Sequence, residues 1–184
     1  MIKINPVMKV AAIHDLSGYG RASLTVVIPV LSAMGIQVVP LPTAVLSTHS
    51  KYPDFRFIDL TDRLPDIVAH WKELGLEFDG IYSGFLGSPE QVHIVSDLIQ
   101  TFDRKGQLVM VDPVMGDDGK IYTPFTPQMV ERMRELVSFA NIITPNMTEA
   151  ALLLGEDFRD SIEQDEVKDW LIRLTDMGPR TAII

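Results

Sequence analysis

The alternation of two kinds of segment along the whole chain constrains its fold most. Apolar runs rich in β-branched residues alternate with stretches in which apolar residues recur at helical spacing. This alternation is typical of a parallel sheet with helices on both faces. The predicted strands span residues 7–13, 37–41, 80–83, 107–111 and 141–144, and a last one begins at Thr181. We therefore predict a three-layer α/β/α domain with a mostly parallel central sheet.

The predicted helices fill the intervals between these strands. Residues 22–34 and 60–74 have helical periodicity, and each stretch ends at a glycine, which is the common residue just past a helix C-terminus. Three further helix starts combine a capping residue with a proline, or with Gln three residues later, and they lie at residues 88–91, 126–127 and 161–164. The helix starts are thus well signalled.

The composition limits the classes of function. The 16 Lys and Arg stand against 25 Asp and Glu, so the net charge of −9 excludes a nucleic-acid footprint built on positive charge. No apolar run approaches the roughly 18 residues of a membrane span, and the N-terminus lacks the apolar core of a signal peptide. We expect a cytoplasmic protein with no membrane partner. The absence of cysteine excludes disulfides, thiolate zinc sites and a cysteine nucleophile.

The end of the chain resembles the start of a buried strand. Residues 181–184 are Thr-Ala-Ile-Ile, and a parallel strand normally continues into a crossover helix. An apolar edge strand without cover is also prone to aggregate. We therefore expect the sequence to be part of a longer chain.

Polar residues that follow each predicted strand are the candidates for a ligand site, because ligands of open α/β sheets bind outside the carboxyl ends of the strands. Residues 14–21 follow the first strand and contain Gly18 and Gly20, which allow a ligand to approach the backbone. The dinucleotide fingerprint fails here because Ser23 replaces its third glycine, and the P-loop pattern is absent from the sequence. A plain turn between strand and helix is the alternative.

The next two candidate segments leave their roles open. Residues 47–52 form a hydroxyl-rich segment that contains His49, and they suit either a ligand site or a solvated loop. Phe85 lies between Gly84 and Gly87 after the third strand. Its ring could stack on a planar ligand or fill the core.

Two acidic segments suit a metal-bound phosphate. Asp112 ends an apolar run, and Pro113 favours an extended conformation that directs the carboxylate into the crevice, although Asp112 is also a common turn residue. Asn146 and Glu149 have the spacing of a capping box. The same geometry would bring a helix N-terminus and a second carboxylate beside Asp112, which is an arrangement that suits Mg²⁺ and a triphosphate.

These motifs occur in an order that resembles a known family. The sequence D-P-V-M-G-D at 112–117 and I-T-P-N-M-T-E at 143–149, together with comparable segments at 17–22, 46–50 and 83–85, resembles the ribokinase-type vitamin kinases and most of all the pyridoxal (pyridoxine, pyridoxamine) kinases. The resemblance covers residues 8–184. It implies a single ribokinase-like domain, of which residues 1–184 are the N-terminal part, roughly two-thirds.

The resemblance also implies an activity and its partners. It implies ATP-dependent phosphorylation of the hydroxymethyl group of a B6 vitamer, with ATP as co-substrate and Mg²⁺ as cofactor, and it allows for a monovalent cation. It implies a homodimer as well. Carried over residue by residue, it assigns Asp112 and Glu149 to the metal and Thr144 and Asn146 to the phosphates.

On the substrate side, the resemblance assigns Asp15, Ser50, Phe85 and Tyr122 to the pyridine ring of the vitamer, with Tyr122 in a flap-like segment. Three of these positions depart from the commoner family pattern. Asp15 stands in place of serine, Ser50 in place of threonine and Phe85 in place of tyrosine. The glycine-rich turn after the first strand is also shorter. The preferred vitamer therefore stays open.

One family motif is missing from residues 1–184. The G-[ST]-G-D segment, which supplies the anion hole and the aspartate base, would lie beyond Ile184. A positioned base is worth about 10²- to 10⁴-fold in rate. Because this base would lie beyond Ile184, no catalytic residue is assigned.

Two alternative functions stay open. One is the hydroxymethylpyrimidine kinase of thiamine synthesis, although its Ser-Gly-Gly-Ala-Gly type of first turn is absent. The other is a vitamin- or nucleotide-binding module without catalysis.

Overall fold

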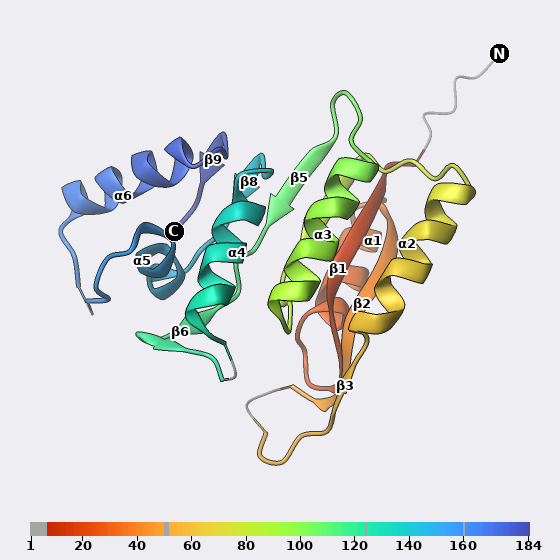
Figure 1. Ribbon diagram of the computed structural model, residues 1–184, viewed down its shortest axis with the longest axis horizontal. Coiled ribbons are helices and arrows are strands. Elements are labelled where there is room, and N and C mark those ends of the chain that lie inside the picture. The colour runs from red at the N-terminus through yellow and green to blue at the C-terminus, as the bar shows by residue number, and fades with distance from the viewer. Residues whose placement is uncertain (1–6, 50–51, 124, 160) are drawn as a thin grey trace.

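A seven-stranded sheet forms the centre of the computed structural model, which describes residues 7–49, 52–123, 125–159 and 161–184 (Figure 1). The strand order is β3-β2-β1-β4-β5-β8-β9, and every neighbouring pair is parallel except β2 and β3. The strands are β1 Lys9–Tyr19, β2 Gln37–Thr48, β3 Phe57–Asp59, β4 Gly80–Ser83, β5 Leu108–Val111, β8 Ile142–Ile143 and β9 Thr181–Ala182. The predicted mostly parallel sheet is confirmed.

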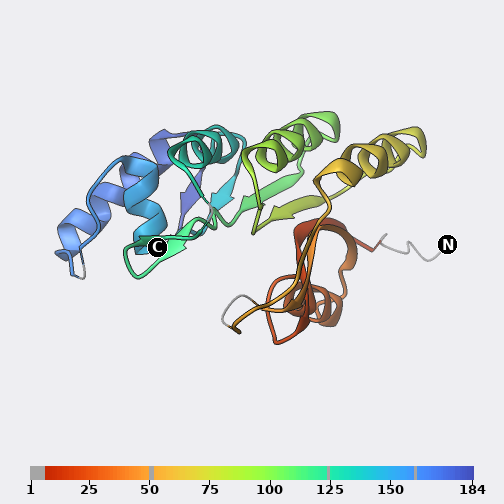
Figure 2. The ribbon, with the colours of Figure 1, turned by 60° about the horizontal axis from the view of Figure 1, so that its bottom comes forward.

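Helices lie on both faces of this sheet. They are α1 Leu24–Ala33, α2 Leu64–Glu73, α3 Pro89–Thr101, α4 Pro127–Val137, α5 Met147–Leu154 and α6 Gln164–Asp176, and a short 3₁₀ turn, η1 Thr61–Arg63, precedes α2. In Figure 2, α2, α3 and α4 lie side by side over one face, and α1 lies on the opposite face. No helix among the described residues is long and apolar enough to cross a bilayer.

The strand order explains this layering. The chain passes from β1 to β2 in one direction along the sheet, and from β4 through β5 and β8 to β9 in the other. Because crossover connections are right-handed, a reversal of direction puts the connecting helices on opposite faces. The reversal also creates a topological switch point between β1 and β4, where ligands of such sheets bind.

The core lies between the sheet and the larger layer of helices. Successive side chains of a strand point to opposite faces, and those on one face of the sheet are buried: Ile13, Ile81, Val109, Val111 and Ile143. Trp170 of α6 is buried in the same cluster. Burying an aliphatic or aromatic side chain of this size contributes about 1.5–3 kcal/mol before entropic costs. This cluster holds the helical layer on the sheet.

The first two strands continue well past their predicted ends. The pairing of β1 with β2 runs to Tyr19 opposite Thr48, whereas the pairing of β1 with β4 ends at Ile13 opposite Ser83. Of residues 14–21, which the sequence analysis places after the first strand as a ligand segment or a plain turn, residues 14–19 therefore belong to the strand. Polar residues and Gly18 interrupt its apolar pattern, which concealed the continuation. The Gly84 N–H makes the last backbone hydrogen bond to this edge of β1, at Ile13 O. After Ile13, the edge of β1 that pairs with β4 has no strand partner among the described residues.

The helix ends agree with the sequence in most places. Ser88 caps α3 by accepting the Gln91 backbone N–H at 3.2 Å, as its spacing predicts. Ser161 was expected to cap a helix, but α6 begins at Gln164 after Glu163. Ile162 packs against the core, and Glu163, in an extended conformation, is the residue that precedes the helix. Leu74, the last residue of the predicted helix at 60–74, is exposed and follows the end of α2.

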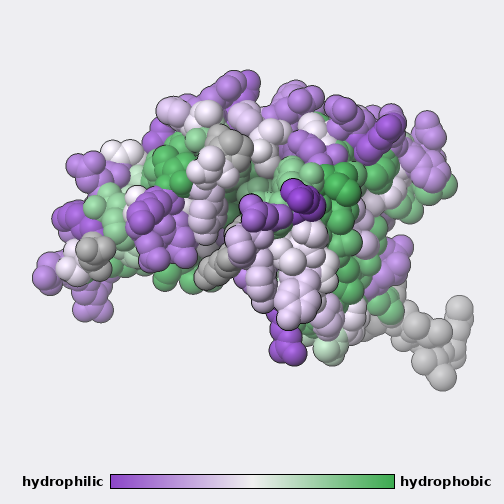
Figure 3. Space-filling view, turned by 90° about the horizontal axis from the view of Figure 1, so that it is seen from below, coloured by the Kyte–Doolittle hydropathy of each residue, from purple (hydrophilic) through white to green (hydrophobic). Residues whose placement is uncertain are grey.

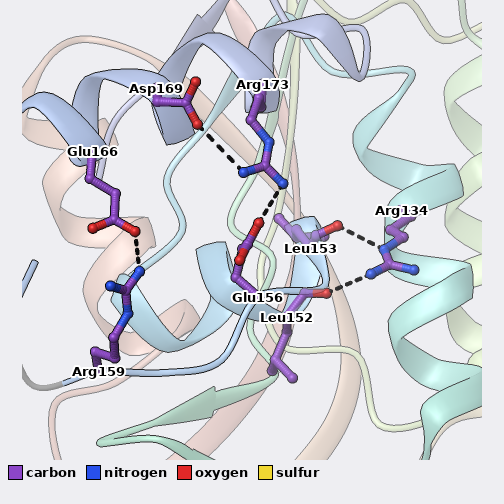
Figure 4. Close-up of polar contacts among 8 residues, drawn as sticks. All are labelled: Arg134, Leu152, Leu153, Glu156, Arg159, Glu166, Asp169 and Arg173. Carbon is purple, nitrogen blue, oxygen red and sulfur yellow. Dashed lines mark hydrogen bonds and ion pairs between the residues drawn. The ribbon is translucent and has the colours of Figure 1, made fainter.

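Polar contacts join α4, α5 and α6 at one end of the molecule (Figure 4). Arg134 of α4 donates from Nε to Leu153 O at 2.8 Å and from Nη2 to Leu152 O at 2.9 Å. These carbonyls lie in the last turn of α5, where helical N–H donors run out, although Leu152 O also accepts the Gly155 N–H at 3.4 Å. The ion pairs in the same region are Arg173–Glu156, Arg173–Asp169 and Arg159–Glu166. The C-terminal turn of α5 is thus fixed to α4.

Candidate active site

The carboxyl ends of the parallel strands point to the lower edge of the molecule in Figure 1. Asp112 follows β5 directly, and its backbone N–H donates to Ser83 O at 2.9 Å, which extends the ladder between β4 and β5 by one residue. The Asp112 side chain is half-buried. Burial raises the pKa of its carboxyl group to about 6.

Glu149 supplies a second carboxylate from the first turn of α5. It is 3% exposed, and it accepts the backbone N–H of Met115 at 3.1 Å and that of Asn146 at 2.9 Å. Its pKa is raised to about 7, chiefly by burial and also by the negative charge of Asp112, while the backbone hydrogen bonds lower it. Asp112 and Glu149 therefore lie within each other's electrostatic field.

This pair fits a divalent cation. Two buried carboxylates that repel one another are stabilised in their charged forms by a cation, and Mg²⁺ prefers oxygen ligands. No cluster of three or more potential metal-ligating His, Cys, Asp or Glu residues occurs in the described part of the chain. Mg²⁺ commonly uses one or two carboxylates and takes its remaining ligands from phosphate and water. Asp112 and Glu149 match that pattern.

For the segment of Asn146, the interpretation as a capping box is compatible with the interpretation as part of a phosphate site. Oδ1 of Asn146 accepts the Glu149 backbone N–H at 2.9 Å, and Glu149 accepts the Asn146 N–H in return, so the capping box is complete. Its Nδ2 also donates to Gly116 O at 2.8 Å. Asn146 therefore caps α5 and holds a neighbouring segment. Thr144 follows β8 at the same edge, and its N–H donates to Val111 O at 3.3 Å.

The segment that Asn146 holds is a hairpin that the sequence analysis missed. It consists of β6 Gly116–Asp117 and β7 Lys120–Ile121, and its turn has positive φ at Asp118 and Gly119. The Asp-Asp-Gly sequence at 117–119 is typical of a turn, but strands of two residues leave no periodic signal. The Gly119 N–H also donates to Thr148 Oγ1 at 2.9 Å. The hairpin is thus docked on the N-terminus of α5.

Tyr122 lies just after this hairpin and is 41% exposed. Its backbone N–H donates to Met115 O at 2.9 Å. Burial raises the pKa of its phenol, and the charges of the surrounding carboxylates raise it further, in the order Asp117, Glu149, Asp118 and Asp112. The structure therefore brings Tyr122 close to the acidic pair.

The residues predicted to face the vitamer are only partly described. Asp15 is 5% exposed, and its carboxylate accepts hydrogen bonds from the hydroxyl of Ser17 at 3.0 Å and from that of Ser23. Ser50 lies outside the described residues. Phe85 is half-buried after β4, and its ring is stacked on that of Phe125 with centroids 5.8 Å apart. Sequence reasoning did not select Phe125, because an aromatic residue before a helix carries no specific signal.

A pocket of about 330 Å³ adjoins the α5 N-terminus. Its lining comprises Asp117, Asp118, Asn146, Met147, Thr148, Phe158 and Arg159. The helix N-terminus and the Arg159 guanidinium contribute positive charge beside the acidic turn. Seen from below, this end of the molecule combines hydrophilic side chains with patches of apolar ones (Figure 3). The pocket is therefore a candidate for part of a nucleotide site.

The fold is that of the ribokinase-like kinases, as solved structures of the same architecture show. Residues 70–184 match the phosphomethylpyrimidine kinase family, and the chain belongs to that family.

Similar proteins include kinases that act on B6 vitamers. A Bacteroides thetaiotaomicron VPI-5482 protein, provisionally described as a phosphomethylpyrimidine kinase and crystallised with pyridoxal, is 54% identical over 96% of this chain and 62% of its own, with a TM-score of 0.93. The pyridoxal kinase of Lactobacillus plantarum is 35% identical over 93% of this chain and 60% of its own, with a TM-score of 0.86. The Bos taurus pyridoxal kinase is 32% identical over 93% of this chain. The chain spans 55% of that bovine protein.

Proposed function

We propose that the protein transfers the γ-phosphoryl group of ATP to the hydroxymethyl group of pyridoxal or a close relative. The observation that carries this proposal is the pair of Asp112, half-buried after β5, and Glu149, buried in the first turn of α5. The similar protein that was crystallised with pyridoxal supports the choice of substrate, since it is 54% identical to this chain. Within the cell, we propose a cytoplasmic homodimer, as the family resemblance implies.

In this reaction the protein mainly positions the reactants and neutralises charge. Asp112 and Glu149 would hold Mg²⁺, which supplies positive charge to the phosphates. The N-terminus of α5 adds its dipole, and Thr144 and Asn146 lie beside the phosphates in this proposal. Phe85, Asp15, Ser50 and Tyr122 would face the vitamer. We assign no catalytic base among the described residues.

The test is a turnover assay with ATP and a panel of four alcohols: pyridoxal, pyridoxine, pyridoxamine and the hydroxymethylpyrimidine. We expect phosphorylation of at least one B6 vitamer. Asp112→Asn should lower kcat/KM by about 100-fold or more, because the variant removes a charge that acts in the transition state. Asp103→Asn, at an exposed position between α3 and the amino end of β5, is the matched control and should change little.

Three other outcomes would contradict parts of this proposal. An unchanged kcat/KM in both Asp112→Asn and Glu149→Gln would refute the assignment of the acidic pair. Preference for the pyrimidine alcohol would favour the thiamine-pathway kinase. Binding of a vitamer without turnover, measured by calorimetry, would favour a binding module.

A further inference from the structure

We propose that Gln91 is a positioning residue that fixes Phe85 at the crevice by joining the β4–α3 loop to β2 and β3. This inference rests on the proposed function, since it assumes that Phe85 faces the vitamer. Gln91 lies in the first turn of α3 and is completely buried. Sequence analysis noted it only as part of a helix start.

The side-chain amide of Gln91 is fully engaged. Its Oε1 accepts the Gly87 backbone N–H at 2.7 Å. Its Nε2 lies 2.9 Å from Thr43 O, 2.9 Å from Thr61 Oγ1 and 3.2 Å from Asp59 Oδ1. The orientation of the amide follows from these partners, because the reverse orientation would bring its NH₂ against the Gly87 N–H and its oxygen against a carbonyl.

These contacts exceed what a helix cap requires. The spacing from Ser88 to Gln91 predicts a glutamine that returns to the backbone N–H of the capping residue. Gln91 instead binds the N–H one residue earlier, at Gly87. Its other partners, on β2, at the end of β3 and in η1, lie 48, 32 and 30 residues away in sequence. Gln91 therefore connects elements that are distant along the chain.

The same network holds both sides of Phe85. Thr43, which is completely buried on β2, donates from Oγ1 to Phe85 O at 3.1 Å. The Gly84 N–H donates to Ile13 O at 3.0 Å, and Leu86 is completely buried. The backbone is thus held at Gly84, Phe85 and Gly87, while the Phe85 ring remains half-buried against Phe125. Since misplacement by about 1 Å can cost about 10²-fold in rate, such fixation matters to an aromatic substrate contact.

The principal variant is Gln91→Met, which keeps the length of the side chain and removes its hydrogen bonds. We expect faster amide exchange at Gly87, by about 10-fold or more, because that N–H loses its acceptor. We also expect KM for pyridoxal to rise about 10-fold while KM for ATP changes less than about twofold.

Gln107→Met is the matched control. Gln107 also binds backbone carbonyls, those of Phe78 and Phe102, at 3.0 Å each, but it lies at the amino end of β5. This variant should lower the melting temperature and leave KM for pyridoxal unchanged. If Gln91→Met does not fold, Thr43→Val removes the hydrogen bond to Phe85 O, and we expect the same selective rise in KM.

The outcomes separate the inference from the proposed function. Unchanged exchange at Gly87 in Gln91→Met would refute the positioning role. Faster exchange with unchanged KM for pyridoxal, or an equal rise for both substrates, would also refute it. If the wild-type protein neither binds nor phosphorylates a B6 vitamer, the proposed function fails, and the exchange comparison still decides whether Gln91 fixes the loop.

Discussion

His14 is a tightly packed titratable residue that follows the last paired residue of the β1–β4 ladder, Ile13. It is 3% exposed, and its ring meets that of Tyr82 edge-on with centroids 4.4 Å apart. Burial lowers its pKa to about 4, and a hydrogen bond to the Tyr82 backbone partly opposes this shift. The imidazole is therefore neutral in the folded protein at physiological pH.

The neutral His14 predicts a loss of stability in acid. The unfolded state takes up a proton below pH 6.5, its unperturbed pKa, whereas the folded state does so only near pH 4. The free energy of unfolding should thus fall as the pH is lowered through this range. Glu149 acts in the opposite direction, because its pKa is raised to about 7. Comparing the wild type with His14→Gln by urea denaturation at several pH values cancels the Glu149 contribution.

The variant should lose stability relative to the wild type at pH 7.5, and this difference should shrink toward pH 4. The exposed His93, replaced in the same way, serves as control and should give a much smaller pH-dependent difference. A constant difference between wild type and His14→Gln would contradict the prediction.

Gly84 and Gly87 provide a second prediction within one loop. A Cβ added at Gly84 would lie 2.2 Å from Nδ1 of His14, which cannot move aside because it is buried. A Cβ at Gly87 would come no closer than 3.5 Å to any neighbour. Gly84→Ala should therefore cost about 2 kcal/mol or more of stability, and Gly87→Ala less than about 1 kcal/mol. Chemical denaturation measures both, and equal costs would show that the contact with His14 is not limiting.

Among the elements, the β6–β7 hairpin depends on α5 for its position. Asn146→Ala removes both the cap of α5 and the hydrogen bond to Gly116 O, so it should cost about 2 kcal/mol, whereas Ser88→Ala removes only a cap and should cost about 1 kcal/mol. The Asn146 variant should also become sensitive to limited proteolysis at 117–120. Equal stability losses with unchanged proteolysis would separate the hairpin from α5.

The elements also show why sequence predicted some features and not others. β4 was predicted at its observed residues, because a short apolar run lies between turn residues. The capping box at Asn146 was predicted because its signal is local. The extension of β1 was missed because polar residues interrupt its apolar pattern, and that of β2 because Pro40 and Pro42 argue against a continuous central strand. The same limit applies to the site: Asp112 was selected from its place after a strand, whereas the partners of Gln91 depend on tertiary structure.

For the whole molecule, the two faces of the sheet are unequally covered. In Figure 2, α1 lies beneath β1 and β2, and the larger layer of helices lies above the sheet. On the lower face, Tyr82, Met110 and Ile142 are half-buried and Leu108 is 49% exposed. An exposed apolar area of this kind should bind a hydrophobic dye in the native state.

Substitution tests this expectation directly. Leu108→Lys should reduce the fluorescence of bound anilinonaphthalene sulfonate without lowering the melting temperature substantially. Ile172→Lys is the control, since Ile172 is 61% exposed on α6. If both variants reduce the fluorescence equally, or neither does, the dye does not bind the lower face of the sheet.

After Ile13, the edge of β1 that pairs with β4 is free, and this free edge bears on which side chains can be substituted in this family. The peptide groups along that edge have no neighbouring strand in the described part of the chain, so a molecule bound there would contact main chain. Main-chain groups are the same for every amino acid except proline, which lacks the N–H. A wall of this kind keeps its hydrogen-bonding capacity through substitution, which allows positions such as Asp15 to diverge while the shape of the crevice persists.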